Sequence, residues 1–288
     1  MIPISIPGFS DPVSSSSHLL AATMAVVGSV FLLRRGRGNL ARMVSLVVFS
    51  FSLIFLFSMS GVFHLLQRGG VARDVVQRLD HAGIWILIAG TFTPIHVILF
   101  RGPWRWAALS VIWVLTISGL VLEVVFFTSI PEWLLLSFFL GLGWIGALSG
   151  YQLMKKFSRD SSLFLLLAGG LCYSIGAVID FSNWPTLFAG VIGPHEIFHF
   201  FVVLAAFSHW LFIYHWSKHP VVDTIFFEVH VFPSRAVLAR AVGEELIIEA
   251  ESVEELKKVV GLRVSEKYHG SIKPVIRLRY HHEELLRS

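Results

Sequence analysis

The sequence predicts an all-α membrane protein, a bundle of seven transmembrane helices, followed by a small soluble α+β domain. Of its 288 residues, 55% are hydrophobic and 15% are charged, with a mean hydropathy of +0.72, whereas a soluble domain has about 25% charged residues. Seven apolar stretches precede a segment rich in charge. We therefore expect a membrane domain at 1–217 and a soluble domain at 218–288. Cys172 is the only cysteine, which excludes a disulfide scaffold.

Each apolar stretch is long enough to cross a membrane, because about 20 residues of helix span the hydrocarbon. The expected spans are 17–33, 43–66, 79–100, 105–127, 133–154, 162–182 and 195–216. The first is not typical of a cleaved signal peptide, since nothing positive precedes it and an Arg-rich cluster follows it. Glycines in the fifth and sixth spans indicate either close helix packing or residues that a helix merely tolerates. They are Gly143, Gly146, Gly150, Gly169, Gly170 and Gly176.

The basic residues between the spans predict the orientation. The loops on the side of the C-terminus carry nine Lys and Arg, and those on the other side carry three. Because basic loops stay in the cytoplasm, we expect the C-terminal domain to be cytoplasmic and the N-terminus to lie outside a cell membrane. A nucleic-acid partner is not expected, because the excess of positive charge lies between apolar runs.

From about residue 218 the pattern becomes that of a soluble domain, with 22 charges in 71 residues. Alternation predicts strands at 224–232 and 274–281, and 236–250 is typical of a hairpin around Gly243 and Glu244. Ser252 and Glu255 form a capping box that opens a helix to about Tyr268. The order β-β-β-α-β resembles the small HicB-like domain. It holds no catalytic constellation, so we expect a regulatory module with a protein partner.

Ionisable residues inside membrane spans indicate function by default, because burying them is costly. Those of this chain gather at helix ends on the outer side: His64, Asp80, His81, Asp180, His195, Glu196 and His199. His195 and His199 are four residues apart, which is a metal-ligand spacing on one helix face, and His64 could complete three ligands. Three histidines leave a fourth position open for water, as in catalytic zinc sites. The alternative is that they are structural histidines with satisfied hydrogen bonds.

Two more side chains are candidates for catalysis. Ser60 lies one turn before His64 and could hydrogen-bond the metal-bound water or an oxyanion, and Asp80 is the natural general base. A carboxylate at a helix N-terminus could instead only complement the helix dipole. His195-Glu196-Ile197-Phe198-His199 also matches the H-E-x-x-H string of zinc proteases. An intramembrane protease would need a carboxylate ligand, which only Asp180 could provide, in an unusual order.

Three spaced motifs closely resemble the hemolysin III family, of the progestin and adipoQ receptor (PAQR) group: Ser60-x-x-x-His64, Leu79-Asp80-His81-Ala82-Gly83-Ile84 and His195 to His199. The resemblance covers residues 15–216, within a superfamily of membrane hydrolases that includes alkaline ceramidases. It implies that the three histidines bind zinc, that Asp80 is the acidic partner of the zinc-bound water and that Ser60 supports the site. The charged tail departs from the family core. The adiponectin receptors of that group have their zinc site towards the cytoplasm, whereas the Arg count here places it near the outer face.

The function expected first is therefore a zinc-dependent hydrolase of a lipid amide or ester, with a membrane lipid as substrate. Three alternatives remain: a membrane sensor or receptor with structural zinc, an intramembrane metalloprotease, and a membrane-lytic hemolysin.

Overall fold

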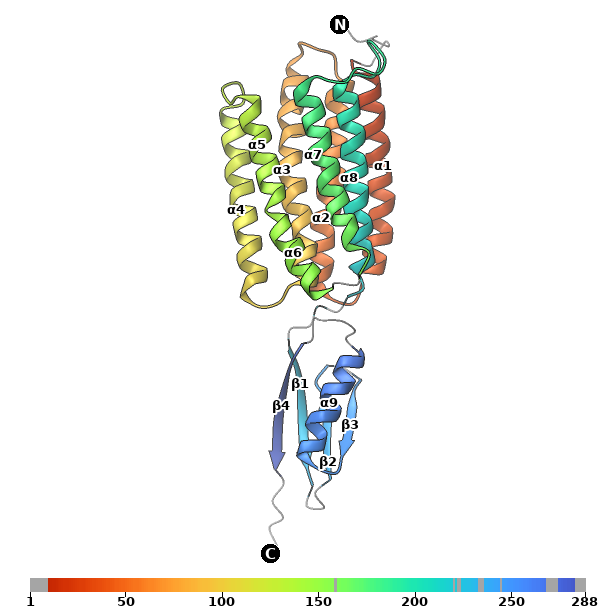
Figure 1. Ribbon diagram of the computed structural model, residues 1–288, viewed down its shortest axis with the longest axis vertical. Coiled ribbons are helices and arrows are strands. Elements are labelled where there is room, and N and C mark those ends of the chain that lie inside the picture. Colours follow the sequence, from red (N-terminus) through yellow and green to blue (C-terminus); the bar gives the residue numbers. More distant parts are fainter. Residues whose placement is uncertain are drawn as a thin grey trace, which may run out of the picture. The chain divides into compact units, whose positions relative to one another are not determined.

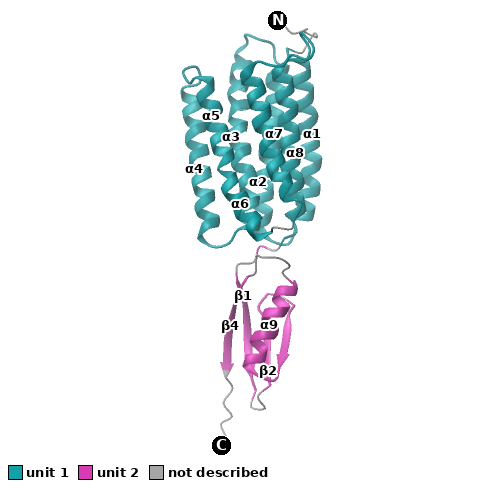
Figure 2. Ribbon diagram, in the orientation of Figure 1, with its two compact units in different colours: residues 1–219 teal, residues 220–288 magenta. Residues whose placement is uncertain are grey.

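The computed structural model describes residues 10–157, 160–219, 221, 224–232, 236–243, 245–267 and 274–282. The chain forms two compact units, Met1–His219 and Pro220–Ser288 (Figure 2). The first is helical and the second is a small sheet with one helix, so the expected fold class is confirmed.

The first unit is a bundle whose helices run along a common direction (Figure 1). In the described part of the chain, seven segments are long and apolar enough to cross a membrane. They are α1 (Pro12–Arg35), α2 (Leu40–Leu65), α3 (Val71–Leu99), α4 (Pro103–Val125), α5 and α6 together (Glu132–Trp144 and Gly146–Lys156), α7 (Leu163–Ser182) and α8 (Pro194–Trp216).

The fifth span consists of two helices, α5 and α6, which are separated at Ile145. Gly141 and Gly143 precede this point, and neither would meet a neighbour if it carried a Cβ. Glycine is a weak helix former, and here no packing contact compensates for it. The glycine content thus explains why one predicted helix is divided.

Two helices begin well before the apolar residues that predicted them. Helix α1 begins at Pro12 and α3 at Val71, because polar residues extend both helices beyond the membrane-crossing stretch. Asp74, not Asp80, occupies the first turn of α3. The interpretation of Asp80 as a carboxylate that complements a helix N-terminus was therefore wrong.

Helix α3 is the most buried of the bundle and packs against α2, α4, α5 and α8, while α1 packs against α2 and α8. Close approach depends on glycines: a Cβ on Gly83 would lie 3.0 Å from the Leu56 Cα, and one on Gly61 would lie 3.0 Å from the Leu19 backbone nitrogen. The other glycines divide into two groups. Gly146, Gly169 and Gly176 face side chains of neighbouring helices, whereas Gly143, Gly150 and Gly170 have open space around them. Both interpretations of the glycines are therefore correct, for different positions.

The second unit is a four-stranded sheet of order β3-β2-β1-β4, in which β4 runs parallel to β1 and the other pairs are antiparallel. Its elements are β1 (Thr224–Val231), β2 (Val237–Ala241), β3 (Ile247–Ala250), α9 (Val253–Lys267) and β4 (Val275–His282). The Ser252 hydroxyl accepts a hydrogen bond from the Glu255 backbone N–H, as expected of the cap. Glu244 and Tyr268 lie outside the described residues.

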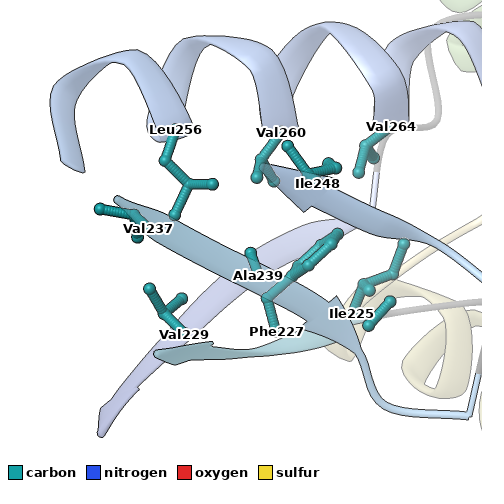
Figure 3. Close-up of a cluster of buried hydrophobic side chains, with 10 residues drawn as sticks. Ile225, Phe227, Val229, Val237, Ala239, Ile248, Leu256, Val260 and Val264 are labelled. Atoms are coloured by element: carbon teal, nitrogen blue, oxygen red, sulfur yellow. The ribbon is translucent and has the colours of Figure 1, made fainter. Parts of the chain in front are cut away.

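One face of this sheet is covered by α9 (Figure 3). Leu256, Val260 and Val264 of the helix share one buried core with alternate residues of β1, including Phe227, which is fully buried. The alternation in the sequence therefore marks the residues of the core, because successive strand residues point to opposite faces.

We expect Gly176→Ala to destabilise the bundle by about 1–3 kcal/mol, because overpacking a filled site forces neighbours to shift. Its Cβ would lie 2.7 Å from the Phe201 Cβ of α8. Gly170→Ala, on the same helix but in open space, is the matched control and should leave stability unchanged or slightly raised. Thermal unfolding in detergent measures both. Equal melting temperatures for the two variants would contradict the packing that the structure shows.

Candidate metal centre

Three histidines converge at one end of the bundle. His64 lies in the last turn of α2, and His195 and His199 lie in the first two turns of α8. The His195 Nε2 atom is 3.3 Å from the His64 Nε2 and 3.0 Å from the His199 Nε2. One ligand atom from each of the three lies within 4.8 Å of the others. The spacing of four residues in α8 places its two rings on one face, as expected.

These distances fit a metal ion. Three nitrogens bound tetrahedrally at a Zn–N length of about 2.05 Å would lie about 3.3 Å apart. His64 and His199 are 4% and 2% exposed, whereas the His195 side chain is 44% exposed, so the centre is buried on two sides and accessible at His195. The group could therefore hold a metal ion.

In two of the three rings, the Nδ1 atom, on the side away from the centre, contacts a carboxylate. The His64 Nδ1 lies 3.1 Å from an Asp11 carboxylate oxygen, and the His195 Nδ1 lies 3.0 Å from one of Asp180. An Nδ1–H that donates to a carboxylate leaves the Nε2 lone pair free and fixes the direction of the ring. Both contacts therefore prepare Nε2 for a metal.

Asp11 was missed by the sequence analysis, which began the first helix at residue 17. It precedes α1 and also binds Arg68 at 2.6 Å and Arg73 at 2.9 Å. Burial alone would raise the pKa of Asp11, but the hydrogen bonds from His64, Arg73 and Arg68 outweigh it and lower this pKa well below its usual range. Asp11 is therefore a carboxylate at neutral pH, and it ties the start of α1 to α2 and α3. An Asp-Pro pair before an apolar helix was the signal that could have indicated it.

Asp80 and Ser60 lie beside the three histidines. Ser60 is buried one turn before His64, and the Asp80 carboxylate lies near both Ser60 and His64. Asp80 has His64 and His195 as electrostatic neighbours, but it is not part of the group of potential ligands. The structure thus brings a carboxylate and a hydroxyl next to the centre without making them ligands.

His81 belongs to a separate contact between helices. Its Nδ1 lies 2.6 Å from one carboxylate oxygen of Glu123 in α4, and the Trp85 Nε1–H donates to the other at 2.5 Å. Glu123 is only 2% exposed. Since both of its oxygens are engaged by α3, Glu123 joins α4 to α3 and is not directed at the three histidines.

Glu196 does not occupy the position of a protease base. One of its carboxylate oxygens accepts a hydrogen bond from the Ser14 hydroxyl at 3.1 Å, and the other accepts one from the Gly193 backbone N–H at 2.9 Å. It therefore caps the start of its own helix and binds α1. Asp180 contacts the Nδ1 of His195 and not the centre itself. Neither carboxylate fits the role that an H-E-x-x-H protease requires.

The sequence analysis also missed His18, in α1. Its ring is 3% exposed and stacks on that of His199, with 3.9 Å between ring centroids. A single histidine in an apolar helix gives no spacing signal, so only the fold reveals that it lies against the centre.

The comparisons with known proteins agree with this arrangement. The sequence profile described as "Haemolysin-III related" matches residues 9–210. The chain belongs to the hemolysin III family. The match includes every side chain of the centre, and it excludes the second unit.

Two Bacillus proteins are similar to this family member. "Hemolysin-3" of Bacillus cereus is 30% identical over 189 residues, which are 65% of this chain and 82% of that protein. "Hemolysin-3 homolog" of Bacillus subtilis (strain 168) is 28% identical over 191 residues, which are 65% and 84% of the two chains. Together with the seven apolar segments, the family makes this a multi-pass membrane protein.

Proposed function

We propose that this hemolysin III protein is a zinc-dependent hydrolase of a lipid amide or ester. One observation carries the proposal: three imidazole Nε2 atoms converge, and beside them lie a carboxylate and a hydroxyl that are not ligands. A purely structural metal would not require that pair. Hydrolysis requires both a place for a proton and a donor for a developing negative charge.

The donor set fits zinc. Imidazole is a ligand that Zn²⁺ favours, and the carboxylates behind His64 and His195 are the outer groups that accompany it. His64, His195 and His199 would hold the ion. When bound, Zn²⁺ would supply a Lewis acid that lowers the pKa of a coordinated water towards about 7 and polarises a carbonyl.

The chain's own residues would handle the proton and the charge. The Asp80 carboxylate accepts a proton from the nucleophilic water and returns it to the leaving group. Ser60 lies near Asp80, and its hydroxyl would donate to the carbonyl oxygen as it becomes negative. A lipid is the substrate class because these groups lie at the ends of membrane-crossing helices. At that level the amide or ester of a lipid meets the polar interface.

The soluble second unit favours a second candidate, a membrane sensor in which zinc is structural. Its sheet carries α9 on one face, while Phe226, Arg240 and Ile247 are exposed on strands. We propose that this unit binds a protein partner in either case. The two candidates differ in what happens to the lipid: a hydrolase cleaves it, whereas a sensor binds it and leaves it intact.

We expect Asp80→Asn to lower lipid release by about 10²–10⁴-fold, because it removes the general base while preserving shape. Purified full-length protein is incubated with a panel of N-acyl amides and acyl esters, with and without a chelator, and free fatty acid is measured. Asp74→Asn, an exposed carboxylate in the first turn of the same helix, is the matched control and should retain activity. Release that survives both the chelator and Asp80→Asn would rule out this mechanism. Lipid binding without release would favour the sensor.

We also propose that the second unit is cytoplasmic and that the three histidines lie near the outer face. The nine basic residues against three support this orientation. A reporter that is active only in the cytoplasm, fused to Ser288, should be active. The same reporter fused before Met1 should be silent, and the reverse pattern would overturn the orientation.

A further inference from the structure

His18 is a buried polar residue that the proposed chemistry does not use. It lies in α1, and its ring stacks on His199 with 32° between the ring planes. The ring of Phe57, from α2, makes an edge-type contact with the His18 ring, with 5.1 Å between centroids and 76° between planes. It is therefore enclosed by α1, α2 and α8.

Both ring nitrogens of His18 lack a hydrogen-bond partner among the described residues. The Nδ1 of His199, in the ring stacked against it, lacks one as well. A buried polar atom without a partner loses its hydrogen bonds to water and gains none in return, and native proteins contain few of them. Three such atoms on two stacked rings indicate that a small polar molecule completes their hydrogen bonds.

The other two histidines of the centre show what His199 lacks. His64 and His195 each have a carboxylate at Nδ1, provided by Asp11 and Asp180. If Nε2 of His199 binds a metal, its Nδ1 carries the proton and needs an acceptor. In the described part of the chain, the polar side chain stacked against that ring is His18.

We propose that His18 is the outer partner of His199 and is joined to its Nδ1 through one buried water. Stacked rings cannot form a direct hydrogen bond, because the nitrogens of both point within their own ring planes. A water at the common edge accepts from the His199 Nδ1–H and donates to the unprotonated nitrogen of His18, and such bridges are common at buried polar atoms. This inference rests on the proposed metal centre.

The arrangement gives α1 a specific role. It holds none of the three ligands, but Asp11 before its first turn and His18 within it would support two of them. The third is supported from α7 by Asp180. His18 is thus a positioning residue, which sets how strongly His199 binds the metal and does not contact substrate.

The test measures metal affinity, not turnover. Full-length protein in detergent is titrated with Zn²⁺ in competition with a chromophoric chelator, and its Co²⁺ form is followed by visible absorption. His18→Phe keeps an aromatic ring over His199 but removes both nitrogens, so we expect about 10–100-fold weaker binding and a shifted Co²⁺ spectrum. His18→Gln retains a donor and an acceptor and should recover most of the affinity. His209→Gln changes a buried histidine of α8 that contacts the Leu166 carbonyl, and it should match the wild type.

Each outcome is decisive. Wild-type affinity and spectrum in His18→Phe would show that His18 only packs, and this inference would fail while the metal centre stands. If the wild type binds neither Zn²⁺ nor Co²⁺, the metal centre fails and the inference with it. If His18→Phe does not fold, His18→Leu against His18→Gln makes the same comparison, and equal affinities would contradict the proposal.

Discussion

The arrangement at this end of the bundle depends on one constraint: three imidazole nitrogens face one another, and two of the three rings are buried. The Nδ1 atoms of His64 and His195 face carboxylates, so their Nε2 lone pairs meet at 3.3 Å and repel unless an added proton or a cation lies between them. An added proton would leave a charged imidazolium in the membrane domain, which is costly. A bound cation removes the repulsion. The carboxylates around the centre fit a bound cation as well. Asp11 and Asp180 contact the Nδ1 atoms of two rings, and Asp80 lies nearby.

This constraint connects helices that are far apart in the chain. Helices α2 and α8 contribute the three histidines, and α7 contributes Asp180. Asp11 ties the start of α1 to the centre and is itself held by Arg68, before α3, and by Arg73, in the first turn of α3. Glu196, which the sequence motif presents as a catalytic base, instead caps α8 and bonds to Ser14 of α1. The polar groups at this end thus position one another, while apolar contacts and close glycines pack the rest of the helices.

Much of this could be predicted from the sequence, because length and hydropathy define a membrane span and a spacing of four residues defines a helix face. The seven segments, the strands of the second unit and the group of His64, His195 and His199 follow from those rules. The contributions of α1 were missed. Its first turns are rich in serine, so hydropathy placed its start five residues too late and left out Asp11. No second histidine lies one helical turn from His18 in the sequence, and only the packing of the helices brings it to His199. The position of Asp80 at a helix terminus was predicted wrongly for a similar reason, since α3 extends beyond its apolar part.

The central claim is that these three histidines hold zinc with an open fourth position. X-ray absorption at the zinc edge of the purified, zinc-loaded protein tests it most directly. The account predicts three nitrogen neighbours of imidazole type at about 2.0–2.1 Å and one oxygen neighbour at a similar distance. In His199→Ala, the imidazole contribution should fall. A zinc ion surrounded by four protein ligands, or by oxygen alone, would contradict the account.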